Sequence, residues 1–346
     1  MPLNMHRHVK SDGRELLLYS DMPLDVSVGV EIASERGSAS HMRWHPLRGE
    51  WVVYAAARQA RTFLPQANDC PLCPARDGHV SEIPFSNYDI AVFENRFPAF
   101  SADAALEQTL PGENVKVATG RCEVLVYSSD HNASIGQLSN AHLSRLIAVW
   151  GERVSALRIM GYPCVLPFEN RGEEIGVTLH HPHGQIYAFS FVPAQLQRAA
   201  EAQASVPVIA QLLETLDREL LVRDESDALS FVPPFAMHPY EIWLAPRRRV
   251  ASPELLNDME REALAVTLGD AVRRLDKLFG KPMPYILTVQ TAPRGFEDTF
   301  HMMVEIKPFL RDVNKLKYLA GVEQGAGVFL VDVLPEQAAQ KLRAVL

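Results

Sequence analysis

The residues with the clearest potential for chemistry lie in the segment His180-His181-Pro182-His183-Gly184-Gln185. An imidazole has an ordinary pKa near 6.5, so a neutral histidine can attack phosphorus at pH 7. A backbone carbonyl that accepts the Nδ1 proton of His183 would leave Nε2 available for this attack. Gln185 can donate an amide hydrogen bond to a phosphoryl oxygen without supplying an acid that favours hydrolysis. The segment therefore predicts phosphoryl or nucleotidyl transfer, with His183 as nucleophile and Gln185 beside it.

A metal site is predicted by Cys70-Pro71-Leu72-Cys73. Two thiolates two residues apart fit around a zinc ion with Zn–S bonds of about 2.3 Å. The further ligands that we expect are His131, in a polar turn after a strand, and His181. This closed Cys2His2 set would hold a structural zinc that does not activate water. From the residues alone, the cysteines could instead be buried small hydrophobic residues, and His131 an exposed loop imidazole.

A transferred phosphate needs positively charged and polar partners. Arg58 and Arg61 offer bidentate guanidinium groups. Asn95, Asn170 and Thr178 are short polar residues next to predicted strand ends. Each of these residues also has a simpler interpretation, since most arginines are solvated and asparagines commonly make turn hydrogen bonds.

The elements that position these residues are predicted from apolar periodicity. Three helices are expected: one capped by Ser139 and running to about Met160, one over about 194–222, and one that begins at Ser252-Pro253 and ends before Gly280. Strands are expected at 15–19, 51–54, 90–93, 122–127, 164–166, 185–192, 229–232, 241–244, 285–289, 301–306 and 328–331. Strand–strand–helix–strand–strand therefore occurs twice, which predicts a duplicated α+β unit with mainly antiparallel sheets. The polar stretch 34–40 is expected to be a linker, with the compact part beginning near Met42.

The bulk composition excludes several classes of protein. With 346 residues and 47% apolar content, the chain can bury a substantial core. Its net charge of −8 argues against a general nucleic-acid-binding or anionic-membrane-binding surface. It contains no apolar run of the roughly 20 residues that span a bilayer, and its start lacks the apolar region of a signal peptide. With neither feature, a cytoplasmic location is expected by default. The four cysteines are too few for a disulfide scaffold.

Taken in order and spacing, these motifs resemble those of the galactose-1-phosphate uridylyltransferases, the transferase branch of the histidine-triad superfamily. The resemblance runs from about residue 41 to the C-terminus and is carried by His-Pro-His-Gly-Gln at 181–185, Phe-Glu-Asn-Arg-Gly at 168–172, Cys-Pro-Leu-Cys at 70–73 and Arg-Gln-Ala-Arg at 58–61. Segments 93–97 and 315–323 add weaker support. The resemblance implies an α+β fold of two histidine-triad-like halves, whose mainly antiparallel strands form a half-barrel with flanking helices. We expect an N-terminal extension at 1–40, a first half at 41–195 and a second half at 196–346.

The resemblance also implies a reaction. His183 would take UMP from UDP-glucose, forming a uridylyl-histidine, and galactose 1-phosphate would then attack this intermediate in a ping-pong exchange. The residues that match family positions for nucleotide phosphates or sugar are Gln185, Asn170, Arg58, Arg61, Asn95 and Thr178. Lys317 and Glu323 match a segment that binds the hexose 1-phosphate and that, in the family, comes from the partner subunit. A homodimer with shared active sites is therefore implied.

Two departures from the family pattern bear on these expectations. Many members have a second metal site that includes a His-x-His pair, but here the segment is His301-Met302-Met303, and Gln290 and Ala199 stand at other candidate positions. We therefore expect one zinc site, with the second metal site absent. Just before His181-Pro182-His183, this chain has Thr178-Leu179-His180 where family members more commonly have a Ser-Asn-Pro type of sequence. His180 itself is expected to be a surface histidine that flanks the site.

Two alternative functions remain open from the sequence. The first is a related hexose-1-phosphate nucleotidyltransferase or phosphorylase that uses ADP-glucose, because nothing in the local sequence specifies the base. The second is a zinc-stabilised nucleotide-binding protein without turnover, since one fold can host many functions.

Overall fold

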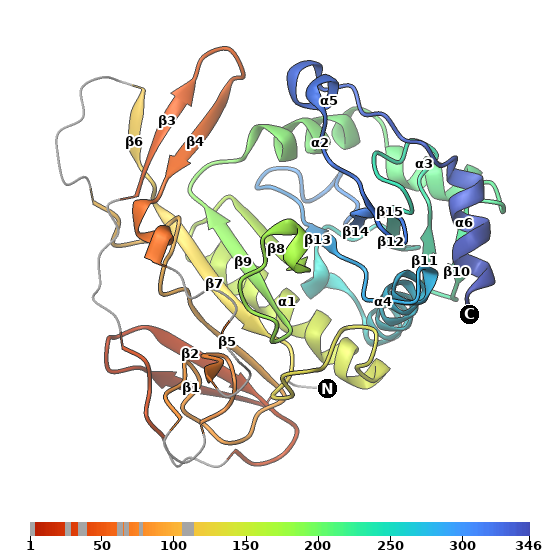
Figure 1. The fold of residues 1–346 in the computed structure, drawn as a ribbon. Coiled ribbons are helices and arrows are strands. Elements are labelled where there is room, and N and C mark those ends of the chain that lie inside the picture. The colour runs from red at the N-terminus through yellow and green to blue at the C-terminus, as the bar shows by residue number, and fades with distance from the viewer. Residues whose placement is uncertain are drawn as a thin grey trace.

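One large antiparallel sheet runs through the computed structural model of the chain (Figure 1). The structure describes residues 4–24, 29–33, 40–60, 65, 69–75, 79–105 and 114–346. In this part of the chain eleven strands follow one another in the sheet, each antiparallel to its neighbours. In spatial order they are β1 (Met5–Val9), β2 (Glu15–Tyr19), β5 (Ile90–Glu94), β7 (Gly120–Val126), β9 (His183–Phe189), β8 (Cys164–Arg171), β13 (Tyr285–Gln290), β14 (Met303–Pro308), β12 (Ile242–Pro246), β11 (Ala228–Phe231) and β10 (Leu221–Asp224).

The strand order repeats. The chain order β5, β7, helix α1 (Asn140–Ile159), β8, β9 gives the sheet order β5-β7-β9-β8. The chain order β11, β12, helix α4 (Asp258–Leu278), β13, β14 gives the corresponding order β11-β12-β14-β13. The two units meet where β8 pairs with β13, Arg171 opposite Tyr285 and Phe168 opposite Thr288. The predicted α+β fold with two similarly built halves and mainly antiparallel strands is confirmed.

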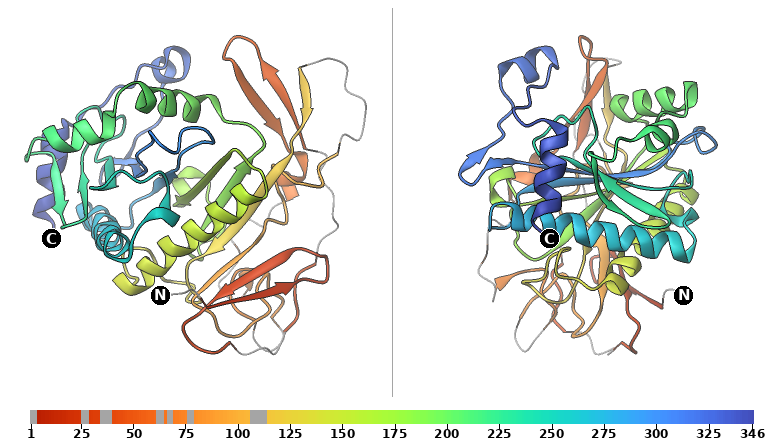
Figure 2. Two further views of the ribbon diagram at one scale, coloured as in Figure 1. Left: turned by 180° about the vertical axis from the view of Figure 1, so that it is seen from behind. Right: turned by 90° about the vertical axis from the view of Figure 1, so that its right-hand side faces the viewer.

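The helices α1 and α4 cover one face of this sheet, as the view from behind in Figure 2 shows for α1. Ser139 caps α1 as predicted, its hydroxyl oxygen accepting from the backbone N–H of His142. Apolar residues of both helices pack in one core with strand residues such as Ile186 and Leu287. Along β9, Gly184, Ile186 and Ala188 are buried, whereas the alternating residues that include His183 and Gln185 are partly exposed. The pleat therefore directs His183 and Gln185 to the face opposite the helices.

Three predicted elements differ from those observed. The expected helix over 194–222 is two helices, α2 (Ala194–Ser205) and α3 (Val208–Thr215), because Pro207 cannot donate a backbone hydrogen bond and disfavours a helical residue before it. At Ser252-Pro253 there is only the 3-10 turn η4 (Pro253–Leu255); α4 begins later, where Asn257 and Glu260 form a capping box. Within the described range 114–346, residues 328–331 form no strand.

The N-terminal residues form an integral part of the sheet. The predicted strand at 15–19 is β2, which pairs with β5 and with β1, and its Leu16 and Leu18 are fully buried. The expectation that the compact part begins near Met42 is therefore wrong: the buried leucines of β2 belong to the core that lies beside the Cys70–Cys73 loop. Most of the expected linker, residues 34–39, lies outside the described residues.

Smaller elements complete the described chain. Strands β3 (His41–His45), β4 (Glu50–Tyr54) and β6 (Val115–Val117) form a separate sheet that projects from the body in Figure 1. The remaining elements are η1 (Ala56–Ala60), η3 (Glu173–Ile175), β15 (Leu310–Asp312), β16 (Lys315–Leu316), α5 (Gly321–Ala326) and α6 (Pro335–Ala344). None of the helices in the described residues is long and apolar enough to span a membrane.

Candidate active site and metal centre

His183 is the first residue of β9, and its ring is oriented by the backbone. The Nδ1 atom lies 2.7 Å from the carbonyl oxygen of His181. A carbonyl oxygen only accepts hydrogen bonds, so Nδ1 carries the proton in the neutral ring and Nε2 keeps its lone pair. This is the arrangement expected from the sequence for a nucleophilic imidazole.

Gly184 is required by a close approach. A Cβ atom at this position would lie 2.2 Å from the Tyr127 hydroxyl oxygen and 2.8 Å from the carbonyl oxygen of Phe168. Both distances are shorter than van der Waals contact, so any side chain would push β9 away from β7 or β8. The glycine therefore fixes the strand on which His183 and Gln185 stand.

A cavity next to His183, here called the His183 cavity, combines apolar walls with polar groups. Asn95 orients Gln185 in it. The Asn95 Oδ1 atom accepts from the Phe97 N–H at 2.9 Å, so its Nδ2 faces Gln185 and lies 3.5 Å from Oε1. Gln185 thereby presents its amide Nε2 as a donor. The lining residues are Pro71, Leu72, Glu82, Phe93, Asn95, Arg96, Phe97, Val124, Thr178, Leu179, His183 and Gln185.

The other predicted substrate-binding residues have different surroundings. Thr178 lines it, and Asn170 lines an adjoining cleft together with His181 and His183. The Arg58 guanidinium donates to the Tyr187 hydroxyl at 2.8 Å, on the β9 face that also carries Gln185. Arg61 lies outside the described residues.

Lys317 and Glu323 are paired with each other. The Lys317 ammonium contacts the Glu323 carboxylate and donates to the Leu330 carbonyl at 2.8 Å. The hydrogen bond from Lys317 is the main cause that lowers the pKa of Glu323 to about 2. Among the residues that the structure describes, neither of the two lines the His183 cavity or the adjoining cleft.

The four predicted metal ligands converge. One ligand atom each from Cys70, Cys73, His131 and His181 lie within 4.8 Å of one another. The Cys73 sulfur is 3.4 Å from Nδ1 of His131 and 3.5 Å from Nδ1 of His181. A tetrahedral ion with Zn–S bonds of about 2.3 Å and Zn–N bonds of about 2.0 Å separates sulfur from nitrogen by about 3.5 Å. The two sulfur–nitrogen distances at Cys73 match the edges of a zinc tetrahedron.

The protonation of the cluster also suits a cation. His181 is fully buried and its Nε2 donates to the Ser128 carbonyl at 2.8 Å, so its Nδ1 lone pair points toward Cys73. The hydrogen bond with Cys73, followed by that with His181, lowers the pKa of Cys70 to about 3. Burial instead raises the pKa of the strand residues Cys122 and Cys164, to about 11 and about 12. Of these three thiols only Cys70, in the cluster, has a lowered pKa, which fits a metal ligand better than a buried apolar residue.

Comparison with known proteins identifies the family. Residues 31–193 match the N-terminal domain of galactose-1-phosphate uridyl transferases, and residues 195–346 match their C-terminal domain. The chain belongs to the galactose-1-phosphate uridylyltransferase family.

Similar proteins cover most of the chain. The galactose-1-phosphate uridylyltransferase of Thermotoga maritima is 35% identical over 321 residues, 87% of this chain and 97% of that protein. That of Streptomyces lividans is 35% identical over 358 residues, 97% of this chain and 96% of that protein. A solved uridylyltransferase structure superposes with a TM-score of 0.78 at 28% identity, covering 88% of this chain and 98% of the other.

Other histidines of this uridylyltransferase-family chain have different surroundings. His180 is 54% exposed and lies 3.2 Å from the carboxylate of Glu173, as expected for a flanking surface residue. The buried His301 donates from Nε2 to the Pro246 carbonyl at 2.8 Å, and burial lowers its pKa. Gln290 donates to Thr288, and Ala199 is exposed on α2.

Sequence reasoning missed two groups beside the site. Glu82 and Arg96 line the His183 cavity, and Glu169 is buried on β8 with its carboxylate 3.1 Å from the Tyr285 hydroxyl. Glu169 and Arg96 lie within the family-like segments 168–172 and 93–97, so their position in these motifs could have marked them as site residues. Glu82 has no local pattern, because it is buried by residues far from it in the sequence.

Proposed function

We propose that this chain exchanges UMP between UDP-glucose and galactose 1-phosphate through a uridylyl-histidine. The observation that carries the proposal is the His183–His181 carbonyl hydrogen bond, which places the Nε2 lone pair of the neutral ring beside a cavity that also holds Gln185. The Nε2 lone pair attacks the α-phosphorus of UDP-glucose, and glucose 1-phosphate leaves. A phosphate oxygen of galactose 1-phosphate then attacks the same phosphorus, UDP-galactose forms, and Nε2 recovers its lone pair.

Two hydrogen bonds support this chemistry. As the P–N bond forms, the ring becomes positively charged, and the His181 carbonyl that accepts from Nδ1 stabilises that charge. The Gln185 amide can donate to a phosphoryl oxygen, since Asn95 already occupies its Oε1. An amide at this position does not supply a proton for hydrolysis, which favours transfer to a second phosphate.

The other residues at the site are assigned to the base, phosphate or sugar of the substrate. Leu72, Phe93, Phe97 and Val124 give the cavity apolar walls suited to a base. The polar residues assigned to phosphate or sugar are Asn95, Thr178, Asn170, Arg58 and Arg61.

A structural zinc is assigned to Cys70, Cys73, His131 and His181. Because these four ligands close the tetrahedron, the metal would have no open position for water and would act by fixing the loops beside His183. One zinc per chain, with no second metal site, remains our prediction.

The assembly is a homodimer with shared active sites. Lys317 and Glu323 are assigned to the hexose 1-phosphate of the partner subunit's site. Neither is among the described residues that line the His183 cavity of their own chain, which supports this assignment. The division of the chain at 1–40, 41–195 and 196–346 also remains a prediction, with β1 and β2 of the first segment paired into the sheet of the second. The cytoplasmic location likewise remains a prediction.

The decisive experiment is labelling. Wild-type protein incubated with UDP-glucose labelled in the α-phosphate should retain an acid-labile nucleotide, whereas labelled ADP-glucose should not label it. His183→Asn should abolish labelling, and the matched control His180→Asn should keep it, because His180 is an exposed neighbour. Labelling of the His183→Asn protein would overturn the mechanism, and preferential labelling by ADP-glucose would favour the ADP-glucose alternative.

A further inference from the structure

The hairpin of β1 and β2 precedes residue 31, where the match to the uridylyltransferase N-terminal domain begins. Its turn is closed by hydrogen bonds between the Lys10 N–H and the Arg14 carbonyl and between the Gly13 N–H and the Lys10 carbonyl. Lys10 and Arg14 are both buried, 2% and 5% exposed. Charged residues at a hairpin turn are normally solvated, so their burial needs an explanation.

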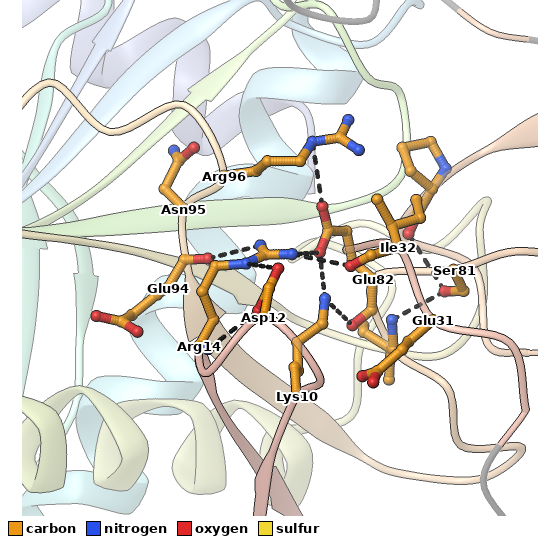
Figure 3. Close-up of polar contacts among 12 residues, drawn as sticks. Lys10, Asp12, Arg14, Glu31, Ile32, Ser81, Glu82, Glu94, Asn95 and Arg96 are labelled. Carbon is orange, nitrogen blue, oxygen red and sulfur yellow. Dashed lines mark hydrogen bonds and ion pairs between the residues drawn. The ribbon is translucent and has the colours of Figure 1, made fainter. Parts of the chain in front are cut away.

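Both side chains converge on Glu82 (Figure 3). The Lys10 ammonium lies 2.5 Å from Glu82 Oε2, and an Arg14 guanidinium nitrogen lies 2.9 Å from the same oxygen. The other carboxylate oxygen faces Arg96, with Nε at 3.5 Å. Glu82 is itself buried, and burying a carboxylate is costly unless cations and hydrogen bonds compensate its charge.

Arg14 also holds the backbone next to the site. Its guanidinium donates to the carbonyl oxygens of Glu94 and Ile32, at 3.1 and 3.0 Å. The Glu94 carbonyl belongs to the peptide bond that leads into Asn95, and Asn95 donates to Gln185. An uninterrupted chain of contacts therefore runs from the hairpin turn to Gln185.

We infer that the N-terminal hairpin is a positioning element of the active site: Lys10 and Arg14 hold Glu82 and the Glu94–Asn95 peptide, and thereby place Asn95 and Arg96 in the His183 cavity. This inference rests on the proposed function, since it concerns binding of the nucleotide donor. The hairpin does not touch the reacting atoms. Loss of the Arg14 contacts should weaken binding of UDP-glucose. It should affect the rate of the second half-reaction less, because the nucleotide is then already attached to His183.

The test compares Arg14→Gln and Arg14→Lys with the control Arg7→Gln. Arg7 stands on the same hairpin and pairs with Glu15, but its side chain is 64% exposed. Lysine at position 14 keeps the positive charge but cannot reproduce the fork of donors that reaches Glu82 and two carbonyls. Each variant is measured for kcat/KM of UDP-glucose, kcat/KM of galactose 1-phosphate, zinc content and melting temperature.

We expect both Arg14 variants to lower kcat/KM for UDP-glucose about tenfold while kcat/KM for galactose 1-phosphate stays within about twofold of wild type. Arg7→Gln should change neither. An equal fall in both constants would indicate less folded enzyme and would overturn the inference, as would wild-type values in Arg14→Gln or Arg14→Lys. If instead the wild-type protein itself is not labelled by UDP-glucose, the proposed function fails, and the inference with it.

Discussion

Glu169 is a buried carboxyl group on β8, the neighbour of β9, without a full counter-charge. It pairs in β8 opposite Leu287 of β13 and accepts a hydrogen bond from the Tyr285 hydroxyl. Burial raises the pKa of Glu169 from 4.5 to about 7, and Arg171 and Tyr285 offset only part of that effect. The folded chain therefore keeps a proton on Glu169 at pH values where the unfolded chain has released it.

This proton predicts a pH dependence of stability. Between about pH 4.5 and 7 the folded state binds more protons than the unfolded state, so stability falls as pH rises through this window, by about 3 kcal/mol at most. Glu169→Gln should remove that slope, whereas the exposed control Glu174→Gln should keep it. Melting temperatures measured from pH 5 to 8 test this; equal slopes in wild type and Glu169→Gln would contradict it.

The metal ligands give a second prediction at this scale. Cys73→Ser replaces a soft thiolate with a hydroxyl, so purified protein should contain clearly less than one zinc per chain and melt at a lower temperature. Cys164→Ser, a buried thiol outside the cluster, should keep the zinc. Elemental analysis of the two variants, purified side by side, gives the answer; full zinc in Cys73→Ser would remove Cys73 from the site.

Residue spacing explains which site residues could be predicted. Cys70 and Cys73, like His181 and His183, stand close together in the sequence, so their chemistry is visible before folding. The contact between Lys10 and Glu82 joins residues 72 positions apart, and no local pattern connects them. Only the pairing of β2 with β5 brings the hairpin turn near Asn95.

At the scale of elements, strands and helices with strong apolar patterns were predictable, and their ends were not. Six apolar residues that recur at three- and four-residue intervals along α1 are all buried: Leu143, Leu146, Ile147, Trp150, Val154 and Leu157. By contrast, the start of α4 depends on whether Ser252 or Asn257 caps it, and both are good capping residues. The capping box formed with Glu260 favours Asn257, and the Ser252-Pro253 signal produces only a short turn.

The packing of α1 against η4 predicts an unusual response to a helix-favouring substitution. Gly151 lies within α1, and a Cβ atom there would meet the backbone nitrogen of Glu254 at 2.6 Å. Gly151→Ala should therefore destabilise the protein by roughly 1–3 kcal/mol, although alanine favours a helix by about 1 kcal/mol. The strain arises because η4 presents backbone atoms, which cannot rotate away.

Gly269→Ala in α4 is the matched control. Its Cβ would meet the side chains of Leu143 and Arg273, which can adopt other rotamers. This variant should be close to neutral. Urea unfolding compares the free energies of unfolding of the two variants. A Gly151→Ala protein as stable as Gly269→Ala would contradict the prediction, because it would show that η4 shifts at little cost.

At the scale of the whole molecule, the two halves share a strand order but carry different side chains on the corresponding strands β9 and β14. In the first half, β9 carries His183 and Gln185; β14 occupies the corresponding place in the second half and follows His301-Met302. The His301 imidazole is buried and bonded to the Pro246 carbonyl. Each chain therefore supplies one His183 cavity, and the second half completes the sheet through β13 and places the segment that carries Lys317 and Glu323.

Shared active sites in a dimer make a quantitative prediction. If the hexose 1-phosphate site takes Lys317 from the partner subunit, His183→Asn and Lys317→Met homodimers are both nearly inactive, but a mixed dimer has one site with both lesions and one site intact. Random exchange at equal amounts makes about half of the dimers mixed, so about a quarter of wild-type activity should return. Activity that stays at the level of the separate parents after verified subunit exchange would instead place Lys317 and His183 of one chain in the same site, and that chain would have to rearrange because its Lys317 is buried against Glu323.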